Sequence, residues 1–171
     1  SFVARSFSGS KKQLNSLIKA AMSHKGFALI DIISPCVTFN NNDESLKSYG
    51  YVKDNNVTLH IADYIPNREP MKEVEVPEGH FRDITLHDGS VIRLETISEE
   101  HDPTNAVAAL SALHAADAES KHVTGLLYFD GTKPSLIEDL ELVETALIDV
   151  PDSELRPSRE ILDKLNAAFL S

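Results

Sequence analysis

The stretch FVARSFSGSKKQLNSLIKAAMSHKGFALIDII, residues 2–33, decides the fold. Its first residues, Phe2–Arg5, predict a short strand that leads into a helix. Residues 8–26 predict that helix, with Ser8 or Ser10 as its N-cap. Apolar residues recur there at helical spacing and predict one buried stripe, made of Leu14, Leu17, Ile18, Ala21 and Met22.

A nearly continuous apolar run, Phe27–Ile33, follows the helix. Such a run is typical of a strand that is buried on both faces of a parallel sheet. Strand, helix and buried strand make a βαβ unit, so the sequence predicts an α/β fold with parallel strands. Pro35 ends the strand because it cannot donate a sheet hydrogen bond, which places Cys36 just past the carboxyl end of a central strand. Ligands gather at such ends in open α/β sheets.

The sequence pattern changes at about residue 55. From there we expect a peripheral extension that covers the preceding domain. Residues 83–97, DITLHDGSVIRLETI, predict a β-hairpin with Asp88 and Gly89 at its turn. Residues 101–120 predict an alanine-rich helix with Asp102 as its N-cap. Further along, the patterns predict a strand at 123–131 and helices at 135–147 and 158–170.

Composition limits the classes of function. The chain has 171 residues, 16 of them basic and 27 acidic, with a net charge of −11. An acidic surface repels phosphate backbones, so we expect no nucleic-acid partner. No apolar run approaches the length of a membrane span, so we expect no membrane partner. One cysteine fits the reducing cytoplasm, and the start at Ser1 inside a predicted strand leads us to expect a piece of a longer protein.

Cys36, the one cysteine, has more than one interpretation from the residues alone. A reactive thiol needs a nearby cation or helix N-terminus and a base, and the nearest upstream histidine, His24, belongs to the preceding helix. A lone cysteine beside a buried strand is most often a small core residue. As a metal ligand it cannot build an iron–sulfur site alone, because such clusters generally use four thiolates.

The other polar motifs are typical of turns and solvated surfaces. The seven histidines show no metal-ligand spacing, and His80 and His87 are expected at the surface beside the hairpin. Glu99–Glu100 and Glu138–Asp139 are expected to be solvated. Residues 6–10, SFSGS, lack the signatures of phosphate-binding loops, so helix capping is the favoured role.

Several segments resemble the C-terminal half of the β subunit of 2-oxoacid:ferredoxin oxidoreductases, most closely the 2-oxoglutarate type. The most specific is SPCVTFN, residues 34–40, and looser likeness continues through KSYGYV, ITLHDGSVIRLETI, HDPTNAVAAL and TGLLYFD. The resemblance implies a partial thiamine-diphosphate-binding-type fold over residues 1–54. Over residues 55–171 it implies a C-terminal extension with a hairpin and helices.

The resemblance also implies a chemistry. In this family a 2-oxoacid, here 2-oxoglutarate, is decarboxylated on thiamine diphosphate with Mg²⁺, and CoA takes up the product as succinyl-CoA. Electrons pass through a [4Fe–4S] cluster to ferredoxin. The resemblance implies that Cys36 binds this cluster as a metal ligand. If it does, we expect the amides of the following loop, residues 37–40, to donate to cluster sulfurs. It assigns no catalytic residue to the chain.

The implied partners are the N-terminal half of the β subunit, the α subunit and ferredoxin. The remaining cluster cysteines and the motif that holds the diphosphate and Mg²⁺ belong to that N-terminal half, so the 171 residues alone are expected to be inactive. Two alternatives stay open. One is the β subunit of a pyruvate:ferredoxin oxidoreductase, and the other is a non-catalytic domain that keeps the fold and binds a partner subunit.

Overall fold

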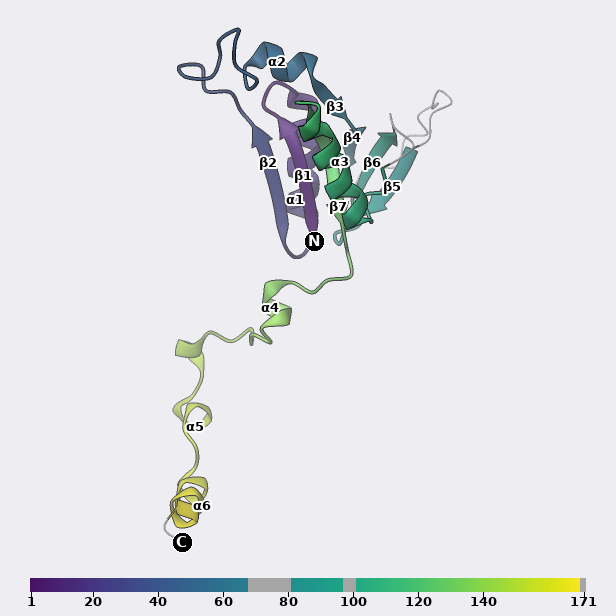
Figure 1. Ribbon diagram of the computed structural model, residues 1–171. Coiled ribbons are helices and arrows are strands. Elements are labelled where there is room, and N and C mark those ends of the chain that lie inside the picture. Colours follow the sequence, from purple (N-terminus) through teal and green to yellow (C-terminus); the bar gives the residue numbers. More distant parts are fainter. Residues whose placement is uncertain (68–80, 97–100, 170–171) are drawn as a thin grey trace. The chain divides into compact units, whose positions relative to one another are not determined.

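A computed structural model describes residues 1–67, 81–96 and 101–169, and contacts divide the chain into two units, Ser1–Leu136 and Ile137–Ser171. A four-stranded mixed sheet of order β2-β1-β7-β3 forms the centre of the first unit (Figure 1). Its strands are β1 (Phe2–Phe7), β2 (Ala28–Ile33), β3 (Asn56–Thr58) and β7 (His122–Phe129).

The predicted βαβ unit is confirmed. β1 pairs in parallel with β2, and α1 (Lys11–Ser23) connects the two strands. On its other side β1 pairs antiparallel with β7, and β7 pairs in parallel with β3. The sheet is therefore mixed α/β in character, with two parallel pairs and one antiparallel pair.

The position of β2 corrects one prediction. The apolar run Phe27–Ile33 predicts a strand buried on both faces, yet β2 is an edge strand with no buried residue. In the predicted run, Phe27, Leu29 and Ile32 are 63%, 49% and 42% exposed. An apolar run identifies a strand, but its neighbours decide its place in the sheet, and β7 takes the central place here with five consecutive buried residues. Cys36 therefore follows an edge strand, not a central one.

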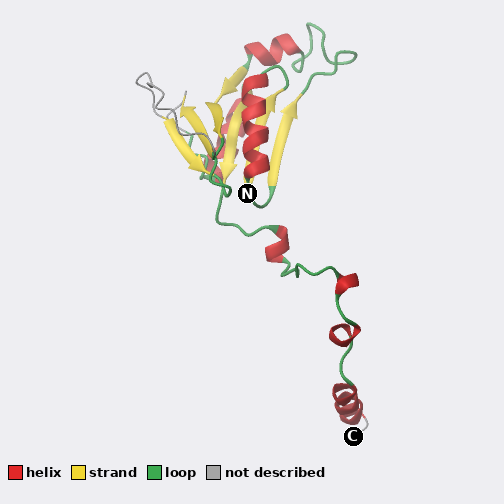
Figure 2. Ribbon diagram, turned by 180° about the vertical axis from the view of Figure 1, so that it is seen from behind, coloured by secondary structure: helices red, strands yellow, loops and turns green. Residues whose placement is uncertain are grey.

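Helices cover the two faces of the sheet. The opposite views in Figures 1 and 2 show α1 on one face and α3 (Ala106–Ala118) on the other. Leu17 and Ala20 of α1 are fully buried in one core cluster. Ile18 and Met22, which belong to the predicted stripe, are exposed, so the buried face of α1 is rotated relative to the prediction. The second core cluster lies between α3 and β7.

A three-stranded antiparallel sheet of order β4-β6-β5 packs against α1. β4 (His60–Ile65) follows β3 almost directly. β5 (Phe81–Thr85) and β6 (Val91–Thr96) form the predicted hairpin, which is confirmed. Gly89 has a φ of +79° at the turn, a left-handed conformation that glycine adopts without steric cost.

The start of α3 differs from the prediction. The Asn105 side chain accepts hydrogen bonds from the backbone N–H groups of Val107 and Ala108, at 3.0 and 3.1 Å, and caps the helix. The Asp102 side chain instead accepts the N–H of Thr104 at 2.9 Å in the preceding turn. Both residues are good N-caps, so sequence alone did not separate them. A short helix, α2 (Tyr49–Asp54), which Ser48 caps, precedes β3.

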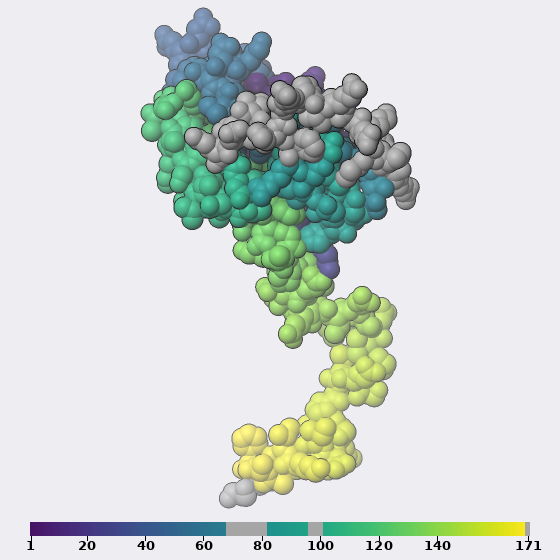
Figure 3. All heavy atoms as spheres, turned by 90° about the vertical axis from the view of Figure 1, so that its right-hand side faces the viewer, coloured from purple at the N-terminus to yellow at the C-terminus, as the bar shows by residue number. Residues whose placement is uncertain are grey.

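The second unit has no buried residue among its described residues, 137–169. The predicted C-terminal helix is confirmed as α6 (Arg159–Phe169), whereas the helix predicted at 135–147 is reduced to α4 (Leu136–Asp139). The other elements are the 3₁₀ turn η1 (Leu147–Asp149) and α5 (Asp152–Leu155). Figure 3 shows this segment, in yellow-green and yellow, as a thin chain without a packed centre. No helix in the described parts of the chain has the length and apolarity to cross a membrane.

Candidate functional site

The loop that carries Cys36 leaves the sheet at the carboxyl ends of β1 and β2, which meet at one edge because the strands are parallel (Figure 1). Pro35 is buried and Cys36 is exposed. The Cys36 carbonyl accepts the N–H groups of Phe39 at 3.2 Å and Asn40 at 2.8 Å, which closes a turn directly after the cysteine. The loop thus anchors the backbone on both sides of a thiol that remains accessible to solvent.

This exposure argues against the interpretation of Cys36 as a core residue. No cluster of three histidine, cysteine, aspartate or glutamate side chains among the described residues is arranged to hold a metal ion. The chain therefore offers one thiolate where a [4Fe–4S] cluster generally uses four, so these residues alone do not fit a complete cluster. The assignment of Cys36 as one ligand stays a prediction. Of its predicted amide donors, those of Phe39 and Asn40 already donate to the Cys36 carbonyl.

A hollow of about 350 Å³ opens beside the Cys36 loop. An ion pair forms part of its wall, because Nε of Arg5 on β1 donates to Oδ2 of Asp31 on β2 at 2.7 Å. His122, at the start of β7, donates from Nε2 to the Leu46 carbonyl at 3.1 Å and holds the segment before α2. The hollow is lined by Arg5, Asp31, Ile33, Ser34, Pro35, Asn40, Lys47 and His122.

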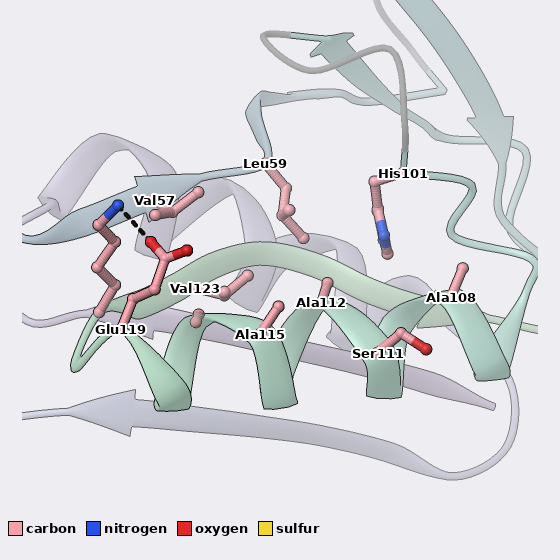
Figure 4. A pocket seen from close by; sticks show the side chains of 11 residues that line it. Val57, Leu59, His101, Ala108, Ser111, Ala112, Ala115, Glu119 and Val123 are labelled. Carbon is pink, nitrogen blue, oxygen red and sulfur yellow. Dashed lines mark hydrogen bonds and ion pairs between the residues drawn. The ribbon is translucent and has the colours of Figure 1, made fainter.

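A second hollow, of about 560 Å³, lies along α3 beside β3 (Figure 4). Its walls are mainly small or aliphatic side chains, such as Val57 and Ala112. His101 lies near one end, and the ion pair of Glu119 and Lys121, 2.6 Å long, closes the other. This groove offers a mainly apolar surface.

Two histidines stabilise an irregularity in β7 that the sequence did not reveal. The register of β7 against β1 shifts between Leu126 and Tyr128, which leaves a bulge in the strand. Nε2 of His60, a buried residue of β4, accepts the backbone N–H of Leu126 at 2.7 Å. His101 donates to the carbonyls of Leu126 and Leu127 at 3.2 and 3.1 Å. Burial, and the proximity of His101, lower the pKa of His60 to about 4, so it is neutral at pH 7.

Gly125 makes this arrangement possible. Its φ is +135°, and a Cβ atom at this position would lie 2.9 Å from Nε2 of His60. A glycine inside an apolar strand pattern is the one sequence signal that indicates such a bulge or close approach. The bulge is a structural feature, because His60 and His101 form hydrogen bonds with backbone groups there.

Among the described histidines, His24 is also buried, with 8% of its surface exposed. Its ring lies among Phe2, His87 and Phe129, and neither ring nitrogen has a hydrogen-bond partner in the described parts of the chain. Burial is the main cause of its lowered pKa of about 4. His87 is exposed, as predicted, whereas His80 lies outside the described residues, as do Glu99 and Glu100. Glu138 and Asp139 are exposed, as predicted.

Part of the chain is similar to known proteins. The β subunit of a 2-oxoacid:ferredoxin oxidoreductase from Sulfolobus sp. is 51% identical over 77 residues, which are 45% of this chain and 22% of that subunit. The β subunit of the 2-oxoacid:ferredoxin oxidoreductase 2 of Aeropyrum pernix is 50% identical over 40 residues. The β subunit of the enzyme of Saccharolobus solfataricus is 48% identical over 40 residues. Each of these 40-residue matches covers 23% of this chain and 13% of the relative.

Part of this chain is thus related to an oxidoreductase subunit. The chain spans about a fifth or less of the length of these curated relatives. No family model matches the sequence. No solved structure matches it either.

Proposed function

We propose that the chain is the C-terminal part of the β subunit of a 2-oxoacid:ferredoxin oxidoreductase, and that Cys36 supplies one thiolate ligand to a [4Fe–4S] cluster. The observation that carries the proposal is an exposed thiol on an anchored loop at the carboxyl edge of β1 and β2, in a chain related to such subunits. The proposed reaction converts 2-oxoglutarate to succinyl-CoA in the cytoplasm and passes electrons to ferredoxin.

The loop suits the role of a ligand because its backbone is fixed. Pro35 is buried, and the two hydrogen bonds to the Cys36 carbonyl close the turn that follows. A cysteine on such a loop presents its sulfur without having to order the chain at the moment of binding. When bound, the cluster supplies one-electron transfer, and the part of this chain is to hold one of its sulfur ligands.

The free edge of β2 supports the proposal that other segments complete the site. β2 pairs only with β1 among the described strands, and Leu29 and Ile32 leave apolar surface exposed there. A strand with an open edge is a template for pairing with another chain or segment. We propose that the N-terminal half of the β subunit pairs here and brings the other cluster cysteines. That half would also bring the groups that hold thiamine diphosphate and Mg²⁺, and the α subunit completes the enzyme.

The division of the chain at residues 54 and 55 also remains a proposal. Residues 1–54 are proposed to belong to the thiamine diphosphate-binding domain and residues 55–171 to the extension. In the structure both segments contribute to the same sheet, because β7 lies between β1 and β3. The extension would thus help to build the domain that it follows.

The test compares two preparations. The purified 171-residue chain, given Fe²⁺ and sulfide under anaerobic conditions, should develop no stable cluster absorbance. The assembled enzyme should contain the cluster, and Cys36→Ser should abolish most ferredoxin reduction while 2-oxoacid binding is retained. Thr38→Ser, on the same exposed loop, is the matched control and should behave like the unchanged enzyme. Normal ferredoxin reduction by the Cys36→Ser enzyme, or a robust cluster on the chain alone, would contradict the proposal.

A second candidate, a non-catalytic domain that binds a partner subunit, is favoured by the apolar groove along α3. The same Cys36→Ser experiment separates the two, because a pure assembly domain would retain cluster content and activity. The choice between 2-oxoglutarate and pyruvate as substrate rests on the ratio of their kcat/KM values in the assembled enzyme. A ratio that favours pyruvate would replace the proposed substrate.

A further inference from the structure

We propose that the hollow beside the Cys36 loop binds a small anion through Arg5 and Lys47. We call this site the basic hollow, defined by Arg5, Lys47 and His122 with the residues between them. The ligand class is a carboxylate or phosphoryl group on a small molecule. The proposal uses no property of the Cys36 thiol and holds whether or not a cluster binds there.

The charge of the hollow departs from that of the chain. The whole chain carries −11, yet the hollow is lined by two basic residues, Arg5 and Lys47, and by one acidic residue, Asp31. Arg5 lies within β1, and Lys47 lies in the turn before α2, so the fold brings together residues that are distant in sequence. With Asp31 paired to Arg5, the lining keeps one net positive charge, and positive charge around a concave surface raises the local concentration of an anion.

Both cations have unused hydrogen-bonding capacity. The ion pair with Asp31 uses Nε of Arg5, and its two terminal amino groups donate no hydrogen bond to any described residue. A guanidinium with this side free still presents a planar pair of donors, the arrangement that binds carboxylate and phosphate in a bidentate manner. The Lys47 ammonium forms no ion pair within the described parts of the chain.

His122 acts as a positioning residue. Its Nε2 donates to the carbonyl of Leu46, the residue before Lys47, at 3.1 Å. The ring of Tyr51 on α2 lies edge-on to the His122 ring, with centroids 6.4 Å apart. The backbone N–H of His122 also donates to the Asn55 carbonyl at 3.0 Å. These contacts hold the segment that bears Lys47 against the start of β7.

The size and position of the hollow suit a small ligand. Its volume of about 350 Å³ falls within the range of small-molecule sites. It lies at the carboxyl edge of two parallel strands, where ligands of open α/β sheets collect. Asn40 and Ser34 add an amide and a hydroxyl group to its wall, and such neutral donors fix the orientation of a bound anion.

The experiment titrates the 171-residue chain with inorganic pyrophosphate in one arm and succinate in the other, at constant ionic strength, and follows backbone amide shifts by NMR. We expect saturable shifts at residues 5, 40 and 47 with at least one anion. Tighter binding of pyrophosphate would identify a phosphoryl ligand, and tighter binding of succinate a carboxylate ligand.

Variants make the test specific to the hollow. Lys47→Gln should raise the Kd about tenfold, because it removes a charge-assisted contact. Arg5→Lys should also weaken binding, since lysine lacks the planar fork. Lys53→Gln, on the exposed surface of α2 and outside the hollow, is the control and should leave the Kd unchanged. The proposal is overturned if neither anion gives saturable shifts, or if Lys47→Gln and Lys53→Gln bind equally well.

Discussion

Two apolar strands of the same sheet, β7 and β2, have opposite environments. β7 pairs with β1 and β3, and it buries five consecutive residues. β2 pairs with β1 alone among the described strands and has no buried residue. The difference lies in their neighbours more than in their composition, because the described chain supplies two strand partners for β7 and one for β2. Apolar sequence therefore tells where a strand forms, and the available partners tell whether its side chains contribute to the core.

The largest expected effect is a direct measure of this difference. Leu126→Ala removes a fully buried side chain from β7 and should lower the free energy of unfolding by about 2–5 kcal/mol. The matched change Leu29→Ala, at a β2 residue that is 49% exposed, should cost less than about 1 kcal/mol. Urea denaturation of the two variants and the unchanged chain measures both losses. Similar losses would mean that β2 is packed in solution.

Acid should weaken the β7 region through His60. The folded pKa of His60, about 4, lies below the unfolded value of about 6.5, so the unfolded chain binds a proton more readily. Stability is fully present above pH 6.5 and should fall by about 3 kcal/mol as the pH falls towards 4. His24 adds a loss in the same direction. Unfolding free energies measured from pH 7 to pH 4 check the slope, and a flat profile would contradict the burial of both rings.

The two buried histidines should respond differently to the same substitution at pH 7. His60→Phe leaves the N–H of Leu126 without its acceptor and should cost about 1–3 kcal/mol. His24→Phe removes ring nitrogens that have no partner, so it should be close to neutral at pH 7 and stabilising at pH 5. Thermal unfolding at both pH values gives the comparison. A larger loss for His24→Phe than for His60→Phe would show that the His24 ring has a partner in solution.

The smallest expected effect extends the comparison to the second unit. Removal of residues 137–171 should change the free energy of unfolding of the first unit by less than about 0.5 kcal/mol, because none of the described residues 137–169 is buried. Chemical denaturation of the shortened chain tests this expectation. A large loss would mean that this segment stabilises the first unit.

Local patterns in the sequence were enough to predict the βαβ unit, the hairpin, α6 and the exposure of His87. They were not enough to predict the order of the strands, which depends on pairing between residues more than a hundred positions apart, such as Phe2 and Phe129. The place of Cys36 after a strand followed from Pro35. The sequence did not predict the hollow beside the Cys36 loop, because Arg5, Lys47 and His122 come together only in the folded chain. His60 was missed for the same reason, because its partner Leu126 lies on a distant strand.

The open edge of β2 also bears on how the chain behaves in concentrated solution. An uncovered strand edge with apolar neighbours invites a second molecule to add its own edge and start an aggregate. Asp31 is the one charged residue of β2, and like charges brought together across two such edges oppose each other. We expect the exposed carboxylate of Asp31 to oppose aggregation in this way, and Asp31→Val to lower the concentration at which the chain precipitates.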